Sequence, residues 1–95
     1  MTISYPADTK NSTVQQGMIA VIFEKNQRNL RPLLGIIEKS FQDIIRSSFH
    51  ARLEGEQDLM VIIVSGVADR IRALERELVG KRGVRSVRLT IVPRE

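Results

Sequence analysis

Two apolar runs decide the fold of this chain, Met18-Ile19-Ala20-Val21-Ile22-Phe23 and Leu59-Met60-Val61-Ile62-Ile63-Val64. Each run is short and rich in β-branched residues, which favours a strand that is buried on both faces. Strands of this kind lie in the middle of a sheet, because an edge strand usually has a wet side. The sequence therefore predicts two central strands.

The segments that follow each run have the periodicity of helices. Apolar residues recur every three or four positions from residue 30 to residue 45, with Asn29 as the expected N-cap. A second stripe between residues 67 and 78 predicts another helix, with Ser65 as its N-cap and its end at the glycines that follow.

Two further segments alternate between apolar and polar residues. In the first, Phe49, Ala51 and Leu53 alternate with His50, Arg52 and Glu54, and residues 84–91 are mixed in a similar way. Strict alternation is typical of a strand with one wet face, so both segments are predicted to be edge strands.

The order strand, helix, strand, strand, helix, strand predicts an α+β fold of the ferredoxin-like, split βαβ type. Right-handed crossovers put both helices on one face of a four-stranded antiparallel sheet, whose strand order is fourth, first, third, second. The other face then exposes alternate residues of both apolar runs. A patch of this kind predicts a second copy of the chain, as a homodimer or homotetramer.

The length of 95 residues suits one domain. We assign residues 17–95 to it and the polar residues 1–16 to a flexible tail. The chain has no cysteine, which excludes disulfides and thiolate metal sites. No apolar run reaches the roughly 18 residues of a membrane span, so we expect a cytoplasmic protein without membrane contact.

The net charge of +4 is concentrated in the last third of the chain. There, Arg82, Arg85 and Arg88 are candidates for an anion patch, because clustered basic residues are typical of sites for phosphates or nucleic acid. Acidic residues interleave with the arginines of the same segment at helical spacing. The alternative is therefore a solvated face with ion pairs.

Several short motifs resemble a known family. They are the strand Met18–Glu24, the helix opening Asn29-Leu30, the segment Asp58–Gly66, and the turn Gly80-Lys81-Arg82-Gly83-Val84-Arg85 ahead of Leu89-Thr90. Over residues 17–93 the chain resembles the C-terminal regulatory domain of the nickel-responsive (NikR-type) repressors of the ribbon-helix-helix class. It is similar also to the stand-alone domains described as regulators of the iron-only hydrogenase system. The resemblance implies an ACT-like domain that acts as a transcriptional regulator or sensor.

The resemblance also implies a nickel site made of three histidines and a cysteine. The corresponding positions of this chain are Lys39, His50, Arg52 and Asp58, so only His50 matches. Cationic side chains in place of nitrogen donors repel a metal ion. We therefore predict no metal and no cofactor, and nickel only if His50 proves to be a ligand.

An ACT-like domain is expected to bind a small-molecule effector at a subunit interface. We place the candidate residues at His50, Arg52 and Glu54, on the face that a partner sheet would cover, with Arg52 as the anchor of an anionic effector. The alternative for Arg52 is a plain interfacial salt bridge with Glu54 or Asp58. Residues 1–16 are too few for a ribbon-helix-helix segment, so we expect either action on DNA through a separate DNA-binding partner or a sensor or assembly module without direct DNA contact.

Three other functions fit the same order of elements. RNA-recognition domains stack bases on aromatic residues of the first and third strands, where this chain has only Phe23. A small oligomeric enzyme would need an acid and a base, and His50 near Glu54 is the only pair on offer. A structural oligomerisation module needs no ligand. We predict a regulatory domain and not an enzyme.

Overall fold

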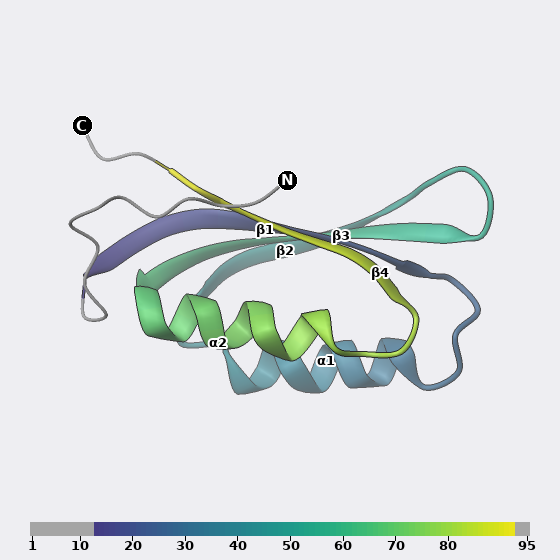
Figure 1. Cartoon of the computed structure of the whole chain (residues 1–95), viewed down its shortest axis with the longest axis horizontal. Helices are drawn as coiled ribbons and strands as arrows, with labels where there is room; N and C mark the ends of the chain where they lie inside the picture. Colours follow the sequence, from purple (N-terminus) through teal and green to yellow (C-terminus); the bar gives the residue numbers. More distant parts are fainter. Residues whose placement is uncertain (1–12, 93–95) are drawn as a thin grey trace.

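The computed structural model describes residues 13–92. Its elements are β1 (Val14–Glu24), α1 (Leu30–Ser40), β2 (Ile45–Arg52), β3 (Gln57–Val67), α2 (Ala68–Val79) and β4 (Val84–Ile91). The strands form one antiparallel sheet in the order β2-β3-β1-β4, and both helices lie on the same side of it (Figure 1). The predicted ferredoxin-like fold, with the two apolar runs in the central strands, is confirmed. Neither helix of the described part is long and apolar enough to cross a membrane.

The core lies between the sheet and the two helices. Alternate residues of the central strands point toward the helices and are at most 1% exposed, namely Ile19, Val21 and Phe23 of β1 and Met60, Ile62 and Val64 of β3. They belong to one apolar cluster with the inward stripes of the helices, Leu30, Leu34 and Ile37 of α1 and Ile71, Leu74 and Leu78 of α2. Removal of this apolar surface from water is the main term that stabilises the fold.

Strand β1 begins earlier than the sequence suggested. Val14 pairs with Val67 of β3, so residues 14–16, which we had assigned to the tail, belong to the sheet. The long β3 offers backbone partners to this polar segment, and paired backbone groups stabilise a strand whatever its side chains. The rest of the predicted tail, residues 1–12, lies outside the described residues.

Helix α1 ends earlier than its apolar stripe suggested. Ser40 is its last residue, and Ile45, which continues the helical spacing, opens β2. The turn between them brings Ile44 against Gly66 of β3, where a Cβ atom would lie 2.5 Å from Ile44 Cγ2. The missing side chain at Gly66 therefore lets Ile44 pack into the core, where it is 3% exposed.

Neither of the two expected N-cap side chains caps a helix. Asn29 precedes α1 in the left-handed conformation, with φ of 67°, and makes no side-chain hydrogen bond to the first turn. Asparagine tolerates this conformation better than most residues. Helix α2 begins at Ala68 after Val67, and Ser65 lies within β3, because β3 stays paired with β1 as far as Val67.

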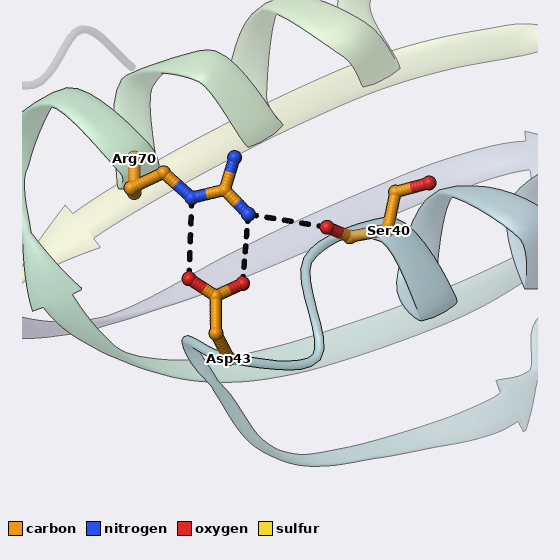
Figure 2. Close-up of polar contacts among 3 residues, drawn as sticks. All are labelled: Ser40, Asp43 and Arg70. Atoms are coloured by element: carbon orange, nitrogen blue, oxygen red, sulfur yellow. Dashed lines mark hydrogen bonds and ion pairs between the residues drawn. The ribbon is translucent and has the colours of Figure 1, made fainter.

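Arg70 ties the first turn of α2 to the end of α1 (Figure 2). Its Nη2 and Nε atoms donate to the Asp43 carboxylate at 2.7 and 3.2 Å, and Nη2 also donates to the Ser40 carbonyl at 3.1 Å. The guanidinium lies 4.4 Å from the centre of the Phe41 ring, a cation–π distance. Hydrogen bonding to Arg70 lowers the pKa of the Asp43 carboxyl below its ordinary value.

The second face of the sheet carries no helix within residues 13–92, and we call it the open face (Figure 1). It presents the other alternate residues of the central strands, Met18, Ala20, Ile22, Leu59, Val61 and Ile63, with Val14 at one end and Phe49 on β2. Val14, Met18 and Phe49 are 56%, 39% and 52% exposed. The predicted apolar patch on the uncovered face is thus present.

Candidate functional site

The polar groups that the sequence singled out gather where the β2–β3 hairpin meets the first turn of α1. Asp58 lies on the helix side of β3, where it pairs across the sheet with Phe23 on one side and Arg52 on the other. Its carboxylate is 3% exposed and accepts from Arg31 Nη2 of α1 at 3.1 Å. Its second oxygen, Oδ1, is buried and makes no hydrogen bond to the described residues.

His50 and Arg52 lie on the helix side of the sheet, and not on the open face as we had predicted. His50 stands opposite Met60, a core residue, and its ring meets the Phe23 ring edge to face with 6.2 Å between the centroids. Residues directly opposite in an antiparallel pair point to the same side, so the apolar Phe49 and Ala51 face the other way. Alternation shows that a strand has two faces, but it does not show which one the helices cover.

Glu54 lies apart from His50 and Arg52. It is exposed in the turn between β2 and β3, and within residues 13–92 it makes no ion pair. Within one chain, Asp58 pairs with Arg31 and not with Arg52, and the interfacial salt bridge of Arg52 stays a prediction. Within residues 13–92 no ion pair joins His50, Arg52 and Glu54, and their shared site at a subunit interface stays a prediction.

The predicted anion patch is divided among three places. Arg85 Nε pairs with Glu24 Oε2 at 2.6 Å, next to the irregularity where β1 and β4 change register. Arg88 pairs with Ala20 in the ladder and so lies on the open face. Arg82 lies in the turn before β4, on neither of these surfaces. The three arginines therefore do not form a common patch.

Arg82 instead lines a cleft with Arg28. The cleft has a volume of about 250 Å³ and is bordered by Gln27, Arg28, Asn29, Leu30, Leu33 and Arg82. Its two walls, the β1–α1 loop and the α2–β4 turn, are held together because Glu24 N–H donates to the Gly83 carbonyl at 2.8 Å. Gly83, with φ of 92°, leaves room for the Gln27 side chain, which a Cβ atom would contact at 2.5 Å.

Both arginines of this cleft are exposed, and neither has an acidic partner among residues 13–92. Two unpaired guanidinium groups at one hollow attract an anion, because a guanidinium can donate two parallel hydrogen bonds to a carboxylate or phosphate. Sequence reasoning named Arg82 but missed Arg28. The two are 54 positions apart in the sequence, and only the fold brings them together.

The donor set of the described part of the chain does not fit a metal site built by one protomer. Within residues 13–92 there is no group of three or more His, Cys, Asp or Glu side chains that could hold a metal ion. Asp58, the buried carboxylate of the hairpin, already has the Arg31 guanidinium against it. A nickel site of the nitrogen and sulfur type would need donors that these positions do not supply.

Comparison with known proteins identifies the family. The profile of the NikR C-terminal nickel binding domain matches residues 16–92, which is most of the chain. The chain belongs to this family. A protein of Methanococcoides burtonii named "Putative nickel-responsive regulator" is 31% identical over 77 residues, which cover 81% of this chain and 55% of that protein. One of the same name from Methanothrix thermoacetophila is 32% identical over 74 residues, or 78% and 53% of the two chains.

Comparison with solved structures shows that this member of the NikR C-terminal family has an ACT-type fold. An uncharacterized protein of Thermotoga maritima superposes with a TM-score of 0.77 at 16% identity, over 85% of this chain and all of that one (100%). The ACT domain of GTP pyrophosphokinase from Chlorobium tepidum gives a TM-score of 0.66 at 18% identity, over 82% and 100% of the two chains. These likenesses confirm the ACT-like fold.

The family matches agree with the resemblance that the strand and turn motifs suggested. The chain spans about half the length of the relatives named above. Those relatives are named as regulators and not as enzymes. The match thus supports a regulatory or sensor type of domain, and it leaves the ligand to be argued from this chain's own residues.

Proposed function

We propose that this chain is a regulatory domain that binds a small anion in the cleft between Arg28 and Arg82. The observation that carries the proposal is the pair of guanidinium groups, from two separate loops, that line one hollow without an acidic partner among residues 13–92. A carboxylate or phosphate group matches this pair in charge and in hydrogen-bonding geometry.

The first turn of α1 adds little to the proposed site. Leu30 N–H already donates to the Gln27 carbonyl at 3.3 Å, and Pro32 has no N–H to offer. Binding would therefore depend on the two arginine side chains, and it would weaken with salt because both are exposed. Leu30 and Leu33 give the cleft an apolar floor, which suits an anion with a short carbon skeleton.

Isothermal titration calorimetry at low salt, with inorganic phosphate and with succinate as probes, tests this proposal. Arg28→Gln and Arg82→Gln should each weaken the binding of the better probe by about tenfold or more, since a charge-assisted contact is lost. Arg46→Gln is the matched control, because Arg46 is exposed on β2 and does not line the cleft. No heat of binding with either probe, or equal losses for all three variants, would contradict the proposal.

We also propose that the domain associates with a second copy through its open face. Half-exposed Val14, Met18 and Phe49 lie on that face together with the apolar residues of the central strands. Water contact with such a surface is unfavourable, and a second sheet of the same kind would cover it. In an assembly of two or more copies, a bound effector could change how the copies associate, and this would be a means of regulation.

RNA binding by the same face is less well supported. Base stacking in ferredoxin-like domains uses exposed aromatic residues of the two central strands. Phe23 points toward the helices and is 0% exposed, and Phe49 lies on the edge strand β2. The described part of the central strands therefore offers no aromatic platform on the open face.

A further inference from the structure

Asp58 is the only charged residue that is buried within residues 13–92. It stands at the second position of β3, where that strand leaves the turn after β2. A carboxylate in this position needs a compensating cation, because burial of an unpaired charge is very unfavourable. The structure supplies that cation from α1, in the form of Arg31.

The geometry of the pair is asymmetric. The Asp58 side chain is 4% exposed, whereas the Arg31 side chain is 62% exposed and reaches from the first turn of α1 to the hairpin. Arg31 Nη2 lies 3.1 Å from Asp58 Oδ2. The guanidinium therefore stays hydrated on one side while it neutralises the buried carboxylate on the other, an arrangement for which arginine is well suited.

We infer that this member of a nickel-binding family holds no metal ion at Asp58, because the Arg31 guanidinium neutralises the buried carboxylate there and joins α1 to the β2–β3 hairpin. The inference goes beyond the proposed anion site and does not depend on it. It rests on the family match, on the single histidine of the chain, and on the contact that joins helix and hairpin.

Charge on this side of the hairpin opposes a divalent cation. Arg31 contacts Asp58, and Arg52 stands directly opposite Asp58 in the ladder. A divalent ion at Asp58 Oδ1 would be repelled by both guanidinium groups. His50 is the only histidine of the chain, so only one imidazole nitrogen ligand is on offer. Arg31 thus neutralises Asp58 and disfavours a metal cation beside it.

Thermal unfolding followed by circular dichroism tests this inference with four proteins: the wild type, Arg31→Gln, Asp58→Asn and the double variant. The wild type should unfold at the same midpoint in EDTA and in excess NiCl2. If nickel bound to the folded protein, a free nickel concentration of about a hundred times the Kd would instead raise the midpoint by roughly 10 °C or more. Arg31→Gln should lower the midpoint by roughly 5–10 °C, because Asp58 is left buried without its cation.

The matched control is Arg28→Gln. Arg28 is a neighbouring arginine without an acidic partner among residues 13–92, so its loss should lower the midpoint by less than about 3 °C. In the Arg31→Gln background, Asp58→Asn should cost less than it does in the wild type, since the two residues are coupled.

Two results would overturn the inference. One is a wild-type midpoint that rises with NiCl2, together with one nickel ion per chain in native mass spectrometry. The other is an Arg31→Gln variant that unfolds at the same midpoint as Arg28→Gln. If Asp58→Asn does not fold, Arg31→Lys still decides the matter: it keeps the charge, so it should recover part of the midpoint that Arg31→Gln loses, and equal losses for the two would contradict an ion pair.

Discussion

Phe49 of β2 and Val61 of β3 lie directly opposite each other on the open face of the sheet. Val61 is 8% exposed, whereas Phe49 is 52% exposed. Val61 on the central strand β3 is thus shielded from water, while the edge strand β2 presents an aromatic ring to it. This arrangement is typical of a surface that a partner covers, because a stable interface combines a packed centre with an aromatic anchor.

The first prediction concerns this ring. Phe49→Ser should shift the protein toward monomer, with a Kd of self-association about tenfold or more weaker, because truncation of an aromatic anchor typically costs at least 1–2 kcal/mol. Sedimentation velocity over a range of protein concentrations measures the change. The far-ultraviolet circular dichroism should stay that of the wild type, since Phe49 is not part of the core cluster.

Ile36→Ser is the matched control for this experiment. Ile36 is 61% exposed on α1, on the helix side of the molecule, and it too is a large apolar residue in contact with water. If Ile36→Ser dissociates the protein and Phe49→Ser does not, the interface lies on the helices and the open-face proposal is wrong.

The second prediction concerns pH and the Asp43–Arg70 pair. The folded-state pKa of Asp43 is lowered, chiefly by the hydrogen bonds from Arg70, so the pair stabilises the fold at neutral pH. A lowered carboxyl pKa gives a contribution that is present above the unfolded-state pKa and is lost as the pH falls through the folded-state pKa. Asp43→Asn should therefore unfold at a lower temperature than the wild type at pH 7.

The difference between Asp43→Asn and the wild type should be constant from pH 7 to about pH 5 and should shrink at lower pH. Thermal melts across this range measure it. Glu54→Gln serves as the control, because Glu54 is exposed in a turn and makes no ion pair within residues 13–92. A difference that persists unchanged at pH 2 would show that Asp43 acts through packing and not through its charge.

The third prediction compares two glycines. At Gly66 a Cβ atom would lie 2.5 Å from Ile44 Cγ2 and 3.1 Å from its Cβ, so Gly66→Ala should destabilise the fold by about 1–3 kcal/mol. At Gly35 an added Cβ atom would meet no atom within 4 Å beyond the adjoining backbone of α1, so Gly35→Ala should stabilise the fold by about 0.5–1 kcal/mol. Urea unfolding gives both free energies. Equal effects of the two changes would mean that the turn at Ile44 is not packed as described.

The fourth prediction concerns salt and the Arg28–Arg82 cleft. Raising NaCl from about 0.01 M to about 0.15 M shortens the screening length from about 30 Å to about 8 Å, so the affinity for the phosphate or succinate probe should fall. The Arg31–Asp58 contact should respond much less, because Asp58 is buried. Calorimetry at the two salt concentrations checks the first point, and thermal melts of the wild type and Arg31→Gln check the second. An affinity that does not change with salt would argue against binding by exposed arginines.

Much of the fold could be predicted from the two central apolar runs. Residues 18–23 and 59–64 are apolar in succession, and only the two central strands of a ferredoxin-like sheet have that environment. The extent of α1 could not be predicted, because Ile44 and Ile45 continue its helical spacing and the sequence does not show that Gly66 receives Ile44 in a turn. Single apolar residues fit more than one element, and the tertiary contact decides.

The candidate site could be predicted only in part. Alternation in β2 separated His50 and Arg52 from Phe49, but the side that the helices cover depends on the register with β3. Arg31 and Asp58 are 27 positions apart, and no periodicity links them. For the same reason Arg28 was missed, although Arg82 had been named. Contacts between residues that are far apart in the chain leave no recognisable pattern in a single sequence.

A two-dimensional 1H–15N NMR titration of the wild-type chain tests most directly the central claim, that the chain binds a small anion in the Arg28–Arg82 cleft and holds no metal ion at His50 and Asp58. With inorganic phosphate, the account predicts shifts confined to residues 27–30 and 81–83. With one equivalent of NiCl2, it predicts an unchanged spectrum around His50 and Asp58. Nickel-dependent changes at those two residues, with no response of the cleft to phosphate, would contradict it.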